Sequence, residues 1–265
     1  MGFDIPMNTK GCFDSNSLLA INNSGLQNQQ PMQQQPMQQQ PMQQQPMQQQ
    51  PMQQQPMQQQ PMQQQPMVQK QRPQGNGVHL KKGQKVALAA SNGGQLSTIK
   101  VCLGWDVMNQ ACDLDASAFM LGADGKVLGD DWFVFYGQTN SPDGSINHSG
   151  DSQGDGTGDD EIITINLNGV NPGVQKITFV VTINEALELG LNFSMVSNAY
   201  VRVVDGTTGQ ELNKFQLTDY YANVTSMVVG EVYRYNGAWK FNAVGDGVAK
   251  DLAGLCEMYG VNVAD

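Results

Sequence analysis

The stretch that decides the fold is SMVVGEVYRYNGAWKFNAV, residues 226–244. Two runs rich in valine and aromatic residues, 226–235 and 238–244, lie on either side of the dipeptide Asn236-Gly237. A tight two-residue turn needs positive φ angles, which glycine adopts without steric cost. The stretch therefore predicts a β-hairpin with its turn at Asn236-Gly237.

Short apolar runs alternate with Gly, Asn and Asp clusters through the whole chain after Gly75, which is the pattern of strands and turns. Further strands are expected at 85–90, 98–104, 113–121, 132–136, 161–167, 176–183, 199–204 and 211–217. Most connections are too short for crossover helices, so the pattern predicts an all-β fold, a β-sandwich of about ten strands.

Two segments are expected to be helical. Residues 185–193 are typical of a short helix. Within residues 248–259, helical spacing relates Val248, Leu252, Leu255 and Tyr259, which predicts a C-terminal helix that packs on the sandwich.

The first 75 residues differ in composition from the rest. Residues 1–30 are expected to form a tail, and residues 31–75 a linker in which Pro-Met-Gln-Gln-Gln repeats seven times. Regular prolines prevent a helix and Gln-Gln-Gln has no apolar side chain to bury, so this Gln/Pro/Met repeat is expected to be disordered. It is either a linker without a binding role, or a segment for self-association or partner capture through Gln and Met. Residues 76–265 remain for one domain with a substantial core.

The net negative charge of the chain is concentrated in one stretch. The formal charge is −10, and the stretch from Asp106 to Glu161 holds twelve acidic residues and one basic residue, Lys126, which sum to −11. Lysine and arginine form no stripe or dense cluster, so nucleic acid is not expected as a partner. The acidic stretch would repel phosphate backbones and anionic lipids, and it would attract cations.

Two clusters in this stretch have the composition of a calcium site. Asp113 and Asp115 project from one face of a predicted strand, where their carboxylates repel each other unless a cation lies between them. The second cluster joins a turn at 140–144, with Asp143 at its tip, to the glycine-rich run 150–161. Calcium takes about six to eight oxygens from carboxylates, backbone carbonyls and water.

The sequence leaves two points open: which cation binds, and to which class of calcium loop the second cluster belongs. The spacing of the acidic residues is not that of an EF-hand, so the second cluster is either a different calcium loop or an acidic loop that binds nothing. No Cys pair or His pair accompanies it, which disfavours zinc and copper, while magnesium remains open.

Nine short motifs occur in order along the chain from about Val78 onward. They are GWD (104–106), DLDASAF (113–119), FVFY (133–136), SPDGS (141–145), GDDE (158–161), VSNAY (196–200), GEVYR (230–234), WKF (239–241) and AVG (243–245). Together they resemble the TerD family of tellurium-resistance and stress proteins. The resemblance implies a β-sandwich that binds calcium through its acidic clusters.

The resemblance also implies a set of calcium ligands. Transferred motif by motif, the candidates are Asp106, Asp113, Asp115, Asp143, Asp151, Asp159, Asp160 and Glu161. The first 75 residues depart from the short family pattern and are similar to the Gln- and Pro-rich extensions of members described as cyclic-AMP-binding proteins. Cyclic AMP is therefore a further candidate ligand.

The expected function is a non-catalytic calcium-binding module of a stress response, because the sequence shows no clear general base or substrate pocket. His148 is interpreted as a solvated turn residue rather than a base. The alternatives are a cyclic-nucleotide or other small-ligand-binding protein, a metal-dependent hydrolase, and a structural protein whose tail drives assembly.

Other residues lead to simpler expectations. Cys102 and Cys256 lie in apolar runs and are expected to pack as small hydrophobic residues. The strand residues Arg202 and Arg234 are expected to pair with Glu231 or Asp205. A signal peptide and a transmembrane segment are not recognisable, so a cytoplasmic protein is expected.

Overall fold

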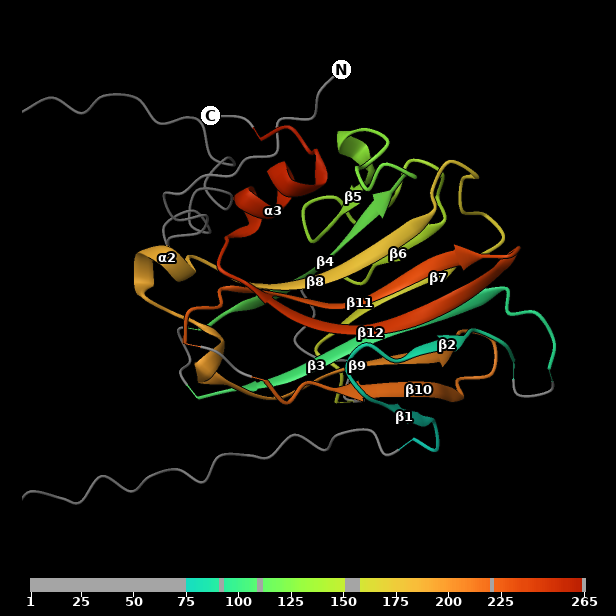
Figure 1. The fold of residues 1–265 in the computed structure, drawn as a ribbon, viewed down its shortest axis with the longest axis horizontal. Helices are drawn as coiled ribbons and strands as arrows, with labels where there is room; N and C mark the ends of the chain where they lie inside the picture. The colour runs from blue at the N-terminus through green and yellow to red at the C-terminus, as the bar shows by residue number, and fades with distance from the viewer. Residues whose placement is uncertain (1–74, 91–92, 109–111, 151–157, 220–221, 264–265) are drawn as a thin grey trace, which may run out of the picture. The chain divides into compact units, whose positions relative to one another are not determined.

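The computed structural model describes residues 75–90, 93–108, 112–150, 158–219 and 222–263. The predicted tail, and the predicted linker up to residue 74, lie outside these residues, and so does the candidate ligand Asp151. The described residues form two six-stranded sheets packed face to face, which confirms the predicted all-β sandwich (Figure 1).

Each sheet combines strands from distant parts of the chain. Sheet A has the order β1-β10-β9-β3-β7-β6, with bounds Val78–Leu80, Glu211–Gln216, Val196–Asp205, Thr98–Val107, Glu161–Asn166 and Ile146–His148. Sheet B has the order β2-β12-β11-β8-β4-β5, with bounds Lys85–Ala87, Ala238–Val248, Ser226–Tyr235, Lys176–Ile183, Leu114–Leu121 and Phe133–Val134. The sequence did not indicate β1 and β6, because an alternation pattern is hard to recognise in strands of three residues.

The predicted hairpin is confirmed by β11 and β12. Tyr235 lies opposite Ala238, and the turn residues Asn236 and Gly237 have φ angles of 50° and 77°. The pairing extends to Ser226 opposite Val248, so Val248 is the last residue of β12 and does not begin a helix.

The helices are shorter than predicted. The C-terminal helix α3 spans Leu252–Tyr259, and its N-cap residue Asp251 accepts a hydrogen bond from the Gly254 N–H at 2.8 Å. The predicted helix at 185–193 is instead a single turn, α2 (Ala186–Leu189), followed by the 3-10 turn η2 (Phe193–Met195). A second 3-10 turn, η1 (Asp130–Trp132), precedes β5.

Two hydrophobic clusters hold the layers together. The larger one lies between the sheets and includes the inward-facing residues Ile99, Val101 and Leu103 of β3. The smaller one lies on the outer face of sheet B, where Leu255 and Cys256 of α3 pack in a cluster with Phe119, Leu121, Phe133 and Val180. The predicted packing of the C-terminal helix on the sandwich, and the burial of Cys102 and Cys256, are confirmed.

One end of the sandwich collects the acidic motifs. β3 ends at Val107 and β4 begins at Leu114, so both strand termini lie at this end. β7 also begins here, because Glu161 pairs with Leu103 of the antiparallel β3. We call this region, with Asp106, Asp113, Asp115 and Asp160, the acidic end; α2 lies there too, at the left of Figure 1.

Candidate functional site

The structure divides the seven described candidate ligands into two groups. The first group is built into the protein framework: Asp159 and Glu161 are almost fully buried, and Asp143 closes its own turn. The second group lies at the acidic end with side chains that are exposed or only partly buried; its members are Asp106, Asp113, Asp115 and Asp160.

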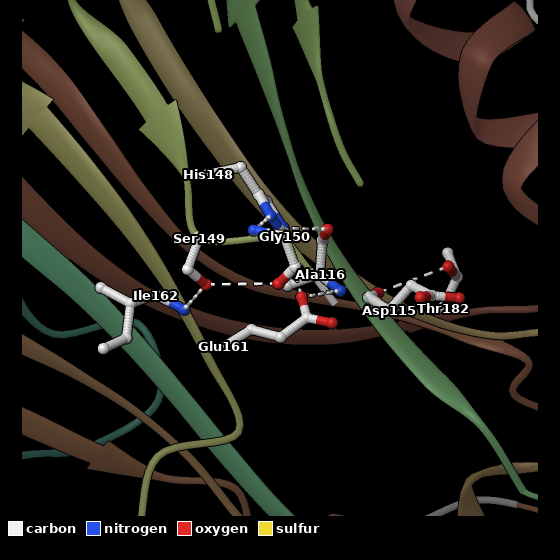
Figure 2. A network of polar contacts seen from close by, with 8 residues as sticks. All are labelled: Asp115, Ala116, His148, Ser149, Gly150, Glu161, Ile162 and Thr182. Atoms are coloured by element: carbon white, nitrogen blue, oxygen red, sulfur yellow. Dashed lines mark hydrogen bonds and ion pairs between the residues drawn. The ribbon is translucent and has the colours of Figure 1, made fainter. Parts of the chain in front are cut away.

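Glu161 and His148 bridge the edges of the two sheets (Figure 2). β5 pairs with β4 at Ala118 and Phe119, which leaves Ala116 beyond the end of that pairing. The Ala116 N–H donates to Glu161 Oε2 at 2.8 Å, and the Ala116 carbonyl lies 3.0 Å from His148 Nε2. The two side chains therefore satisfy both backbone groups of a buried residue at an uncovered strand edge.

The hydrogen bonds of His148 define its tautomer. The Gly150 N–H donates to Nδ1 at 2.9 Å, so the ring hydrogen is on Nε2, which faces the Ala116 carbonyl and, at 3.2 Å, Glu161 Oε2. The His148 side chain is 0% exposed. The interpretation of His148 as a solvated turn residue is wrong, because His148 ends β6 on the same buried face as Ile146.

Asp159 forms a buried ion pair with Arg202. Its side chain is 1% exposed, and Arg202 donates to it from Nε at 2.9 Å and from Nη2 at 2.5 Å. The Tyr200 hydroxyl lies 2.7 Å from Asp159 Oδ1. Such a two-pronged guanidinium–carboxylate pair is among the stronger charged hydrogen-bond geometries.

The expected pairing of the strand arginines with Glu231 or Asp205 is therefore wrong. Arg234 donates instead to the carbonyls of Val170 and Val174, and its guanidinium stacks over Trp239. Glu231 pairs with Lys176 at 2.8 Å. Partners of this kind could not be read from the sequence because they lie on loops and strands about 60 positions away.

Asp143 closes its own turn. Oδ1 accepts from the Ser141 hydroxyl and the Ser145 N–H, and Oδ2 accepts from the Asn171 N–H at 2.8 Å. Burial raises the pKa of Asp143, but the hydrogen bonds from Ser141, Asn171 and Ser145 outweigh it and hold the pKa below its ordinary value. The turn predicted at 140–144 is thus confirmed, and the carboxylate ties it to the loop before β8.

Asp106 and Asp160 are both neighbours of Trp105 at the acidic end. Asp160 Oδ2 accepts from the Trp105 N–H at 2.8 Å, and Asp106 Oδ2 accepts from Asn198 Nδ2 at 2.8 Å. Asn198 belongs to the VSNAY motif and has a φ of 52°. The structure thereby brings three separate motifs together around the end of β3.

Asp113 and Asp115 lie at the start of β4. Asp113 is exposed and directly precedes the strand, while Asp115 is its second residue and is partly buried. The intervening Leu114 and the following Ala116 face the core, so both aspartates are on the other face, as predicted. Within the described ranges, no group of three or more His, Cys, Asp or Glu side chains could by itself hold a metal ion.

Two buried cysteines, Cys102 and Cys112, lie near this end. Burial, with a further contribution from Asp159, raises the pKa of Cys102 to about 12. Burial, with a contribution from Asp113, also raises the pKa of Cys112. The carboxylates gathered at the acidic end are hard oxygen donors.

Sequence reasoning missed the protein donors that hold the first group of carboxylates. A signal existed for Glu161: it shares a face of its strand with Ile163 and Ile165, and both isoleucines are buried. Strand alternation alone therefore predicts that Glu161 points into the sandwich. The roles of Tyr200 and Arg202 had no comparable signal.

The helices within the described ranges are all too short or too polar to cross a membrane.

Comparison with known proteins identifies relatives over the sandwich. The model of the TerD domain matches residues 77–259. A tellurium resistance protein TerD from an Alcaligenes species is 45% identical over 191 residues, covering 71% of this chain and 99% of that protein. The Serratia marcescens protein of the same name is 44% identical, with 71% and 99% covered. General stress protein 16U of Bacillus subtilis is 43% identical, with 70% and 98% covered.

Proposed function

The chain belongs to the TerD family of tellurium-resistance and stress proteins, and from this premise we propose that it is a non-catalytic calcium-binding module of a stress response. The ligands at the acidic end are Asp106 and Asp160 beside β3 of sheet A and Asp113 and Asp115 beside β4 of sheet B; each pair is completed by backbone carbonyls, water or ligands outside the described residues. Asp151, outside the described residues, remains a predicted ligand. When bound, calcium supplies positive charge that offsets the repulsion between these carboxylates.

One observation carries the proposal: the termini of three strands bring carboxylates from separate motifs to one end of the sandwich. The stretch that contains them has a net charge of −11. The charge of Arg202 does not offset them, because its guanidinium pairs with Asp159 and Glu211. Carboxylate oxygens are hard ligands, which fit calcium better than zinc or copper.

The remaining candidates are assigned to the protein framework. Asp143, Asp159 and Glu161 accept hydrogen bonds from backbone and side-chain donors, and these bonds join loops and sheet edges. A carboxylate that holds the framework contributes to a calcium site indirectly, by fixing the positions of its neighbours.

Neither histidine is placed to act as a base at the acidic end. A metal-dependent hydrolase needs a group that can take a proton from a metal-bound water. Both ring nitrogens of His148 are engaged in hydrogen bonds inside the sandwich, and His79 lies on the edge strand β1 rather than at the acidic end. This arrangement removes both histidines as candidates for that group.

Calcium titration of the full-length protein tests the proposal. We expect binding heat by calorimetry and, at a calcium concentration about 100 times Kd, a stabilisation of about 2.7 kcal/mol. For a domain of this size that corresponds to a rise in Tm of about 5–10 °C. The double variant Asp113→Asn, Asp115→Asn should lose most of both effects.

The matched control is Asp124→Asn. Asp124 is exposed and lies in the turn after β4, at the opposite end of that strand from Asp113. This variant should bind calcium as the wild type does. An absence of both heat and thermal shift in the wild type would sink the calcium proposal.

A further inference from the structure

A buried charged network lies on the outer face of sheet A, next to the acidic end. The guanidinium of Arg202, on β9, contacts Asp159 on one side and Glu211 of β10 on the other, with Nη1 3.4 Å from Glu211 Oε2. The side chains of Arg202, Asp159 and Glu211 are 13%, 1% and 2% exposed. Moving or removing one member of such a buried charged group leaves another charge uncompensated, which is strongly destabilising. The three side chains are therefore held in fixed positions relative to one another.

The charge balance of this network favours a permanently charged arginine. Burial lowers the pKa of Arg202, but the hydrogen bonds and the charge of Asp159 outweigh it, and the pKa lies above its ordinary value. Asp159 precedes Asp160 and Glu161 directly, so the arginine holds the segment 158–161 from one side.

Tyr200 holds the same segment from β9 as well. Its hydroxyl lies 2.9 Å from the Gly158 carbonyl and 2.7 Å from Asp159 Oδ1. The ring lies across Gly104 of β3, where a Cβ atom would come within 2.4 Å of it. Lys214 Nζ lies 4.1 Å from the ring centroid. Glycine at position 104 thus allows Tyr200 to lie against β3 and reach the segment.

The segment held by Arg202 and Tyr200 leads directly into the acidic end. The Asp160 N–H donates to the Leu103 carbonyl at 2.7 Å, and Asp160 Oδ2 accepts from the Trp105 N–H. Both contacts place Asp160 against Trp105, the residue before Asp106, near the end of β3. Asp159 and Asp160 are adjacent in the chain. A shift of Asp159 by about 1 Å would therefore also move Asp160 relative to Asp106.

We propose that Arg202, supported by Tyr200, is a positioning residue that seats segment 158–161 on β3 and thereby sets the calcium affinity of the acidic end. The first half of this inference concerns the protein alone, and the second half rests on the proposed function. Arg202 does not touch the cation. It acts through Asp159, as groups behind metal ligands commonly do, and their loss typically weakens metal affinity about 10–100-fold.

Two variants of the full-length protein test the effect on affinity. Arg202→Met should raise the calcium Kd by about tenfold or more in calorimetry. Arg202→Lys should recover only part of the affinity, because lysine keeps the charge but cannot make the two-pronged contact with Asp159. The matched control is Arg234→Met on β11, which removes a partly buried strand arginine but should leave the Kd within about twofold of wild type.

A measurement in EDTA tests the seating itself. Amide hydrogen exchange of Trp105 reports on its hydrogen bond to Asp160, and we expect Arg202→Met to accelerate it at least about tenfold. Exchange at Val232, in the middle of β11, should not change beyond any loss of global stability. If Arg202→Met does not fold, Tyr200→Phe, which removes one hydroxyl group, should produce the same changes with smaller amplitude.

The outcomes separate the two halves of the inference. Unchanged Trp105 exchange in a folded Arg202 or Tyr200 variant overturns the seating. Accelerated exchange with an unchanged Kd overturns the control of affinity. If the wild type binds no calcium, the proposed function fails and the affinity half falls with it, while the exchange result still decides the seating.

Discussion

Replacing Glu161 with alanine should destabilise the domain even when all calcium has been removed. The Ala116 N–H would lose its acceptor in a buried position, which costs about 1–3 kcal/mol. His148 would lose its contact with Oε2, and the missing side chain would leave a small cavity at a site that is 4% exposed, adding about 1–2 kcal/mol. Removal of a buried negative charge offsets part of this loss. The expected net destabilisation is about 2–4 kcal/mol.

Urea denaturation in EDTA measures this effect directly. For a domain of this size the loss corresponds to a fall in Tm of roughly 5–15 °C. Glu161→Gln should cost about 1 kcal/mol, because its amide oxygen can still accept from the Ala116 N–H. Asp113→Ala, at an exposed position of the same acidic stretch, should stay within about 0.5 kcal/mol of wild type.

The experiment distinguishes the two roles available to Glu161. If Glu161 only binds calcium, its replacement should not change the stability in EDTA and should lower it only when calcium is present. Wild-type stability of Glu161→Ala in EDTA, combined with a loss of calcium binding, would refute the framework role and restore Glu161 to the predicted ligand set.

Three further predictions follow from the local geometry. Gly104→Ala should destabilise the domain by about 1–3 kcal/mol, measured by thermal unfolding, because the added methyl group overlaps the ring of Tyr200. The lowered pKa of Asp143 means that its contribution to stability is complete above the unfolded value of about 3.9 and is lost as the pH falls through the lower folded value. Asp143→Asn should therefore flatten the decline of the urea midpoint between about pH 5 and pH 3, whereas an unchanged decline would contradict the assignment. The pKa values of about 12 for Cys102 and Cys256 predict that iodoacetamide at pH 8 alkylates both thiols far more slowly in the folded protein than in urea, as mass spectrometry of the modified peptides can measure.

The sequence by itself determined the class of fold and the family. Strand alternation and the Asn236-Gly237 turn are local properties, so they were readable without any partner, and the hairpin lies where the pattern predicted it. The ends of the elements were predicted less accurately, because they depend on pairing with distant strands. Val248 suits a helix by spacing, but pairing with Ser226 keeps it in β12.

Only the tertiary structure decided what each acidic residue contacts. Asp160 and Glu161 are neighbours in one motif, yet successive side chains of a strand point in opposite directions. Glu161 therefore enters the sandwich and accepts from Ala116, 45 positions away, while Asp160 accepts from Trp105 at the acidic end. The sequence supplied the carboxylates and their number. Their division between the protein framework and the proposed calcium site depends on donors that only the folded chain brings within hydrogen-bonding distance.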